Sequence, residues 1–383
     1  MQPIALFVQI LFVVSLAISC TSPTSEKTKI KAYFSDEIKK IPLVQGGTIM
    51  VSYAQIAPFK NYLTYSYNNF LSDRMEVYDF QADTLLFTVP YKEEGPDGVP
   101  RGNYYIADDY ITIKGAYEQV FFDFGGKVIK RYRLLNKEGR KDSQVEIPYS
   151  EYWLRLSSNS RGISKYFDTR SEKAYLGLVR QDVALMSESF FDAPTIIGEI
   201  DHKSNTIRSL PITFPEDFRQ YQQFGAAAID FILPFILIKG DSLIYNFSGS
   251  ADIYIYDITK QKMASTVRAP SSYMPPKIDV TLPRSGSHIS YLQNQQPNFG
   301  HITYDPYRNY YYRVNFAPVE DDDYWSRVRY FTIMDAHFSV LQEVPLTQDC
   351  SSTIYGPAPE GVYFKQRNPP SEDTTYFKLL RIE

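Results

Sequence analysis

Apolar and polar residues alternate along much of this chain, in short runs that end at turn-forming residues. The run Tyr62-Leu-Thr-Tyr-Ser-Tyr67 shows this two-residue period, and a second short run, Met75-Glu-Val-Tyr-Asp-Phe80, follows it. Such a period is typical of a strand with one buried face. No long segment has the 3.6-residue period of an amphipathic helix, and the best helical candidate, 216–224, is short. The pattern predicts an all-β protein.

A larger repeat is built on these strands. Five times a strand ends in an apolar residue followed by Asp, and a tight turn and a second strand follow. The pairs are Tyr78-Asp79, Phe122-Asp123, Ile200-Asp201, Tyr256-Asp257 and Met334-Asp335. Four of the five second strands run into a proline at or soon after their ends, namely Pro90, Pro211, Pro270 and Pro345. The repeat predicts a fold made of similar strand pairs.

The residue types in this repeat have physical reasons. An Asp before a tight turn can accept hydrogen bonds from backbone N–H groups two residues further on. Proline has no N–H to donate to a strand ladder, so it belongs at strand ends and on edge strands. Lys and Arg residues on the same strands also deter pairing between edges. We therefore interpret the Asp residues as turn formers rather than metal ligands.

The two ends of the chain complement each other. The sixth unit has strands at Val362-Tyr-Phe-Lys365 and Tyr376–Ile382, but the chain stops before its last strand. The segment Glu37–Leu43 can supply that strand from the N-terminus, as expected for a closed propeller. We predict one domain over residues 31–383, an all-β six-bladed β-propeller closed by pairing the N-terminal strand with the C-terminal blade. Two β-sandwich domains would also explain the strand content, but not these complementary ends.

The first residues predict export. Ile4–Ser19 is apolar except for Gln9 and Ser15, and its length of about sixteen residues falls short of the roughly 20 that span a bilayer. It fits a secretory signal peptide over residues 1–19. Ala17-Ile-Ser-Cys20 resembles a bacterial lipobox, which implies lipidation at Cys20. The alternative is an ordinary signal peptide with an incidental cysteine. We expect residues 20–30 to form a tether, and the protein to be an outer-membrane lipoprotein that faces the periplasm.

Composition limits the other partners. Lipidation of Cys20 would leave Cys350 without a partner, so we expect no disulfide. The formal net charge of −4 argues against binding to nucleic acid. Aromatic residues make up 15% of the chain, with 32 Tyr and 2 Trp, and Tyr and Phe favour strands.

The long connections between units are where we expect a binding site, because functional loops concentrate there. They span residues 91–102, 136–150, 214–224 and 269–299, and the turns after the repeated Asp residues are short. The candidate ligand-binding residues are Glu93, Glu94, Arg101, Tyr273, Arg284, His288, Tyr291 and Arg313. Glu93, Glu94 and Arg101 could serve acid–base chemistry or hold a cation, and the tyrosines, Arg284 and His288 suit sugar or peptide contacts.

Each candidate also has a structural interpretation. The Gly and Pro residues around Glu94 suit a turn between blades, the segment 271–299 suits a solvated loop, and Arg313 suits strand packing with a buried partner. The acidic run Glu320–Asp323 suits a solvated surface better than a calcium site. The four His residues lack metal-ligand spacing, and neither a Gly-x-Ser-x-Gly elbow nor a phosphate loop is present. We therefore expect no catalytic residue, metal or cofactor.

Three local motifs and the six-fold pattern together resemble a known family. The motifs are the lipobox, the loop Glu94-Gly95-Pro96 and the stretch Tyr304-Asp-Pro-Tyr-Arg308. They resemble Bacteroidetes lipoproteins of the domain of unknown function 4221 family, which is related to six-bladed propeller lipoproteins with a Gly-Glu-Gly-Pro loop. Glu93 of this chain stands where the first Gly of that loop would be. The resemblance implies the propeller fold and a cell-envelope location, but no reaction.

Two functions remain open from the sequence. The first is a non-enzymatic binding module that takes a peptide, a glycan or a partner protein of the envelope. The second is a propeller hydrolase or lyase that acts on a glycan or lactone with a metal in the channel. Three or more carboxylates or histidines meeting at one point would favour the enzyme.

Overall fold

The computed structural model describes most of the chain from residue 30 onward. The described residues are 30–43, 54–69, 74–90, 98, 103–106, 109–114, 118–133, 152–153, 165–168, 173–180, 183–201, 203–204, 206–280, 291–292, 294–319, 327–371 and 373–383. The predicted signal peptide and tether, with Cys20, lie outside them. None of the described helices is long and apolar enough to cross a membrane.

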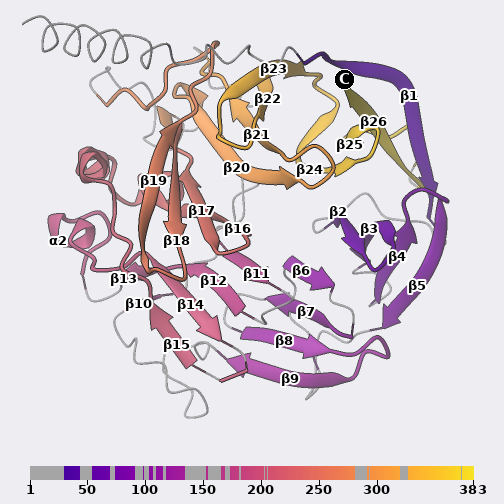
Figure 1. The fold of residues 1–383 in the computed structure, drawn as a ribbon, viewed down its shortest axis with the longest axis horizontal. Helices are drawn as coiled ribbons and strands as arrows, with labels where there is room; N and C mark the ends of the chain where they lie inside the picture. The colour runs from indigo at the N-terminus through magenta and orange to yellow at the C-terminus, as the bar shows by residue number, and fades with distance from the viewer. Residues whose placement is uncertain are drawn as a thin grey trace, which may run out of the picture. The chain divides into compact units, whose positions relative to one another are not determined.

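The described strands form six four-stranded antiparallel sheets, each a blade of a β-propeller, which follow one another around a ring in chain order (Figure 1). This confirms the predicted all-β six-bladed fold. Blade 1 contains β2 (Ala54–Phe59), β3 (Tyr62–Asn69), β4 (Arg74–Asp79) and β5 (Thr84–Pro90). Blade 2 contains β6 (Asn103–Ile106), β7 (Ile111–Lys114), β8 (Glu118–Phe122) and β9 (Val128–Arg133).

Blade 3 has additional strands and helical segments beside its four-stranded sheet. It contains β11 (Lys165–Asp168), β12 (Lys173–Gly177), β14 (Ile197–Asp201) and β15 (Thr206–Ser209). A separate two-stranded ladder joins β10 (Tyr152–Trp153) to β13 (Val179–Arg180). Between β13 and β16 the described chain has three helical segments, namely α2 (Glu188–Phe191), the 3₁₀ helix η1 (Glu216–Ala228) and α3 (Ile229–Ile232). The helical candidate 216–224 is therefore helical, but with 3₁₀ geometry and a break at Gly225.

Blades 4 and 5 are the most regular. Blade 4 contains β16 (Pro234–Lys239), β17 (Ser242–Phe247), β18 (Asp252–Asp257) and β19 (Lys262–Arg268). Blade 5 contains β20 (Asn298–Asp305), β21 (Tyr310–Phe316), β22 (Arg329–Met334) and β23 (Val340–Leu346).

Blade 6 closes the propeller with a strand from the other end of the chain. It contains β24 (Cys350–Ala358), β25 (Gly361–Gln366), β26 (Thr374–Ile382) and, at its outer edge, β1 (Ala32–Pro42). β1 pairs antiparallel with β26, from Ala32 opposite Ile382 to Pro42 opposite Thr374. This confirms the predicted closure and extends the closing strand five residues towards the N-terminus relative to the expected Glu37.

The repeated Asp residues form the turns predicted from the sequence. Asp79 Oδ1 accepts hydrogen bonds from the backbone N–H groups of Gln81 (2.8 Å) and Ala82 (3.1 Å). The same kind of bond, at 2.8 to 2.9 Å, is made by Asp123, Asp201, Asp257 and Asp335. The prolines mark outer strands, since β5, β15, β19 and β23 each lie at the edge of a sheet. The repeat is therefore scaffold.

Apolar side chains fill the spaces between neighbouring blades. One buried cluster joins Tyr65 and Phe80 of blade 1 to Phe377 of blade 6 and to Ile41 of β1. Other clusters join blades 1 and 2, blades 4 and 5, and blades 3 and 4 with the helical segments. Burial of apolar surface between sheets thus provides the main cohesive force of the ring.

The turn between β8 and β9 touches blade 1 and can be tested at one glycine. Gly126 has φ +84°, and a Cβ atom there would lie 1.9 Å from the carbonyl oxygen of Pro90. We expect Gly126→Ala to lower the free energy of unfolding by about 2–4 kcal/mol, from left-handed strain plus the clash. Gly240→Ala is the matched control, because Gly240 has φ +57° but no atom within 4 Å of its Cβ position. Urea unfolding measures both, and equal losses would contradict the predicted contact.

Candidate functional site

The structure describes three of the eight ligand-binding residues predicted from the sequence. Glu93, Glu94, Arg101, Arg284 and His288 lie outside the described residues, as does Cys20. Of the others, Tyr273 is exposed, whereas Tyr291 and Arg313 are buried. The three described candidates therefore do not form one exposed site, because they lie in different environments.

Tyr291 belongs to the core. It is 1% exposed, its hydroxyl donates a 2.7 Å hydrogen bond to the carbonyl oxygen of Asp279, and its ring stacks on Phe224 of η1 at 5.8 Å. The ring of Tyr291 thus packs against the helical segment, and a ligand contact at this residue stays a prediction. The sequence places Tyr291 in a long connection, but that connection folds back onto blade 4.

Tyr273 remains as an exposed aromatic residue. It lies in the connection after β19, has 54% of its surface exposed, and stacks almost parallel on Tyr330 of β22, with ring centroids 4.2 Å apart. The preceding N–H group, of Ser272, donates a 2.6 Å hydrogen bond to Glu343 Oε2 on β23. One ring face is thus held against blade 5, which fixes the orientation of a half-exposed ring.

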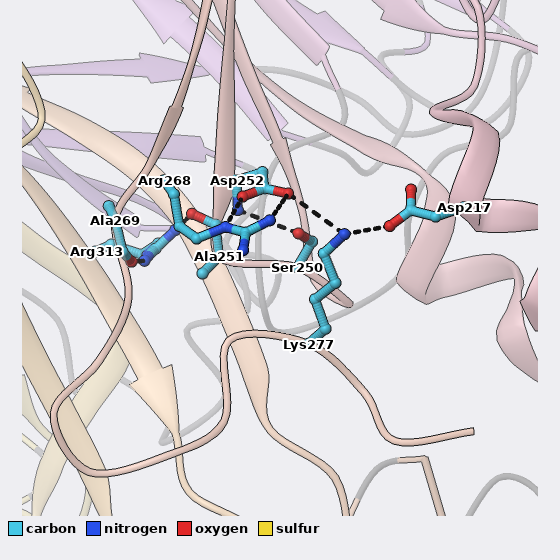
Figure 2. Close-up of polar contacts among 8 residues, drawn as sticks. All are labelled: Asp217, Ser250, Ala251, Asp252, Arg268, Ala269, Lys277 and Arg313. Carbon is cyan, nitrogen blue, oxygen red and sulfur yellow. Dashed lines mark hydrogen bonds and ion pairs between the residues drawn. The ribbon is translucent and has the colours of Figure 1, made fainter. Parts of the chain in front are cut away.

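A charged cluster lies at the start of the same connection, and Figure 2 shows it as a row of alternating charges. We call Asp217, Asp252, Arg268 and Lys277 the blade 4 cluster. Arg268 Nε and Nη2 donate to Asp252 Oδ1 and Oδ2 at 2.8 and 3.3 Å. Lys277 Nζ lies 3.6 Å from Asp252 Oδ2 and also donates a hydrogen bond to Asp217 of η1.

Backbone pairing places these residues together. Asp252 and Arg268 lie opposite each other at the ends of β18 and β19. The connection then returns to the β17–β18 turn, where Ala251 N–H donates to Pro276 O at 2.8 Å and Lys277 bridges Ser250. In an antiparallel blade, these strand ends lie at the edge from which the long connection leaves. The blade 4 cluster therefore lies on the predicted long-connection side.

The cluster is electrostatically balanced. Burial raises the pKa of Asp252, but hydrogen bonds from Arg268 and the charges of Arg268 and Lys277 outweigh it, so that the net pKa lies below its usual value. The hydrogen bond to Asp252 in turn raises the pKa of Arg268. Asp252 is therefore ionised at neutral pH. The arginine side chain remains more than half exposed, so its guanidinium group keeps access to solvent.

Arg313 stabilises the backbone next to the blade 4 cluster. It is fully buried in β21 and donates hydrogen bonds to the carbonyl oxygens of Ala251 (3.3 Å) and Ala269 (2.6 Å) in blade 4. Burial lowers the pKa of Arg313 to about 10, although the negative charges of Glu343 and Asp252 act in the opposite direction. Arg313 is therefore a structural link between blades 4 and 5, and a ligand contact at this residue stays a prediction.

The sequence analysis missed the four residues of the blade 4 cluster, although one signal was available. A hairpin centred on the turn after Asp257 pairs Asp252 with Arg268, so this ion pair follows from the repeat itself. Nothing in the sequence signals Lys277 or Asp217, because the return of the connection and the position of η1 bring them in. Among the described residues, no three His, Cys, Asp or Glu side chains lie together as a metal site would require.

This arrangement suits a ligand that is bound through an apolar contact and several hydrogen bonds, rather than through one strong charge. Tyr273 offers a flat apolar face, on which a sugar ring or another aromatic group can stack. Arg268 and Lys277 offer N–H donors nearby along the same connection, and their carboxylate partners offer acceptors. A ligand with both a flat apolar face and hydrogen-bonding groups would match these features.

Comparisons with known proteins agree with this fold. Residues 48–345 match the family described as "Domain of unknown function (DUF4221)". No curated protein sequence matches the chain. The crystal structure of a DUF4221 member from Bacteroides vulgatus ATCC 8482 is 16% identical with a TM-score of 0.70, and the alignment covers 94% of this chain and 99% of that chain.

A second structure, a putative exported protein from Bacteroides fragilis NCTC 9343, is 9% identical with a TM-score of 0.52, covering 94% of this chain and 98% of that one. A luciferin-regenerating enzyme has a TM-score of only 0.42, which carries no argument. At these identities the structural likenesses show the fold alone. The family match, in contrast, covers most of the chain, and the protein belongs to the DUF4221 family.

Proposed function

We propose that this protein is a non-enzymatic binding module of the cell envelope, anchored to the outer membrane by a lipid on Cys20 and facing the periplasm. Its ligand is a glycan, a peptide or a partner protein, held at Tyr273 and the blade 4 cluster. The observation that carries this proposal is the exposed face of Tyr273, which is fixed by stacking on Tyr330 and lies in the connection that also carries Lys277. Exposed aromatic rings with restricted motion lose little conformational entropy on binding.

The position of Tyr273 supports the proposal as well. The other large exposed tyrosines of the described chain lie at or beside short turns: Tyr62 begins β3 and is 45% exposed, and Tyr307 lies between β20 and β21 and is 46% exposed. Tyr273 instead lies in a long connection, where functional residues are expected. Its ring stacks on Tyr330, and the N–H group of the preceding Ser272 donates to Glu343, so that two strands of blade 5 fix this position.

The Tyr273 side chain can be tested against Tyr307. The wild-type protein and the variants Tyr273→Ala and Tyr307→Ala would be used to capture ligands from solubilised envelope, and the retained ligand would then be titrated. We expect Tyr273→Ala to weaken binding by about 2 kcal/mol, roughly 30-fold in Kd, because a central aromatic contact is lost. Tyr307→Ala should bind like the wild type. Equal affinities of all three proteins would exclude Tyr273 from the site.

The anchor has a separate test. Cells that express the full chain would be fed a fatty-acid analogue, and the purified protein would be assayed for label. We expect Cys20→Ala to lose the label completely, because Cys20 would be the acceptor in the lipobox-like motif, whereas Cys350→Ala should keep it. Labelling that persists in Cys20→Ala would refute the lipid anchor and leave the binding site unaffected.

A further inference from the structure

Lys365 is a half-buried lysine for which the described residues provide no hydrogen-bond or ion-pair partner. It is the second-last residue of β25 in blade 6, in the yellow part of Figure 1. Lys378 on the neighbouring strand β26 differs, because its Nζ forms a 2.8 Å ion pair with Asp349. A buried ammonium group without a counter-charge is costly, and an apolar side chain would fill the same space at lower cost. An unpaired amine at such a position therefore suggests a function.

The backbone opposite Lys365 is irregular. Cys350 of β24 pairs with Gln366 and Tyr355 pairs with Phe364, so that four residues, 351–354, occupy the place of one opposite Lys365. Ser351 Oγ accepts hydrogen bonds from the N–H groups of Thr353 (3.2 Å) and Ile354 (3.0 Å), which stabilises this bulge. β-Bulges are enriched next to active sites, where they redirect side chains. Here the bulge lies on the inner strand of the blade, opposite the backbone of Lys365.

The surroundings of Lys365 are apolar and aromatic. It pairs with Phe377 of β26, whose ring lies 5.0 Å from Tyr65 of blade 1, and it shares a strand face with Tyr363. Burial lowers the pKa of Lys365 to about 8. At pH 7 about a tenth of such amines are unprotonated, compared with fewer than about one in a thousand for an ordinary lysine.

Other titratable groups near Lys365 do not compensate its charge. Burial raises the pKa of both Tyr65 and Tyr363, and that of the Cys350 thiol on β24, so these groups are neutral around pH 7. Asp349 is bound to Lys378, and the net effect of its surroundings lowers the pKa of Asp349 despite burial. Among the described residues, the amine of Lys365 therefore has no anionic group that would hold it protonated.

We propose that Lys365 is a covalent binding site for an aldehyde ligand. The unprotonated Nζ adds to the carbonyl carbon, and the carbinolamine loses water to give an imine. The carbonyl oxygen leaves in that water with both amine protons, and addition of water reverses the reaction. No oxidant or reductant takes part, and an unpaired, desolvated amine is the form that this chemistry uses. The site lies in blade 6 and does not depend on the role proposed for Tyr273.

The test uses the full chain with propanal and sodium cyanoborohydride, which reduces the imine to a stable secondary amine. Peptide mass spectrometry then gives the rate of labelling at each lysine. We expect Lys365 to be labelled at pH 7 at least about tenfold faster than Lys262, an exposed lysine on β19, and its rate to be half-maximal near pH 8. Labelling of Lys365 should also saturate at a propanal concentration at which labelling of Lys262 still rises linearly.

Two variants control for the position. Lys365→Arg should abolish the fast adduct, whereas Lys378→Arg, which keeps a charge beside Asp349, should leave it unchanged. A labelling rate at Lys365 equal to or below that of Lys262 would overturn the proposal. A rate that rises linearly with propanal over the whole range would also overturn it, because it would show an activated amine without a binding site.

Discussion

Removal of residues 1–43 should destabilise the propeller by at least about 5 kcal/mol, which is comparable to the total stability of many domains. The deletion removes β1, and β26 then becomes an unprotected outer edge. The ladder between β1 and β26 extends from Ala32 to Pro42, and Ile41 is completely buried. Full burial of one such side chain contributes about 1.5–3 kcal/mol, and each backbone hydrogen bond about 0.5–1.5 kcal/mol.

The closing strand also connects three blades, which increases the expected effect. The strand β1 pairs with blade 6, and it also contacts blade 1, because Lys39 Nζ lies 2.5 Å from Asp83 Oδ1. On the other side, Gln342 of blade 5 accepts a hydrogen bond from Ala32 N–H at 2.9 Å and donates one to Ala32 O at 3.2 Å. Loss of β1 therefore breaks contacts with both neighbours of blade 6 as well as with blade 6 itself.

Urea unfolding of the truncated and untruncated chains would measure this loss. A synthetic peptide of residues 31–43 should bind the truncated protein and restore the urea midpoint, because it rebuilds the missing edge strand. The same peptide with Ile41→Asp should fail, since it would bury an unpaired carboxylate among Tyr65, Phe80 and Phe377. An unchanged urea midpoint after truncation would contradict closure by β1.

Arg313→Met should lower the free energy of unfolding by about 3–5 kcal/mol. The substitution keeps an apolar stem but leaves the buried carbonyl groups of Ala251 and Ala269 without their donor. Each unsatisfied buried polar group costs about 1–3 kcal/mol. The positive charge near Glu343 and Asp252 is lost as well, which removes a favourable electrostatic interaction with both acids.

Arg268→Met is the matched control, since both arginines lie near Asp252 but Arg268 is more than half exposed. Asp252 is buried but keeps Lys277 Nζ at 3.6 Å, and an exposed arginine contributes little to an ion pair, so this variant should lose about 1 kcal/mol of unfolding free energy, less than Arg313→Met. The difference in the free energy of unfolding between the two variants measures how much the burial of an arginine adds to stability. If Arg313→Met also unfolds within 1 kcal/mol of the wild type, the link between blades 4 and 5 does not depend on its guanidinium group.

The two substitutions also separate scaffold from binding surface. Arg313 donates a hydrogen bond to the backbone next to the blade 4 cluster, whereas Arg268 is an exposed member of that cluster. A ligand that contacts the cluster should therefore lose affinity in Arg268→Met with a smaller loss of stability than in Arg313→Met. This distinction matters because a destabilised variant can lose binding for reasons unrelated to contact.

Local sequence signals determined much of the fold. The Asp residues before tight turns and the prolines on outer strands act within a few residues of their own positions, so the repeat could be recognised and its six units counted. The complementary ends of the chain predicted closure. The innermost strand of blade 1, β2, was missed, because its sequence Ala-Gln-Ile-Ala-Pro-Phe contains a proline and no clear alternation.

The site depended on the tertiary structure. Tyr273, Tyr291 and Arg313 are equally plausible ligand contacts as residue types, and only packing shows that the first is exposed and the other two are buried. Asp217 and Lys277 meet because a connection folds back onto the β17–β18 turn beside η1, which no local pattern encodes. By itself the sequence determined the repeating scaffold, because turns and edges are local. Only the tertiary structure decided which side chains face solvent together, because that depends on contacts between residues distant in the chain.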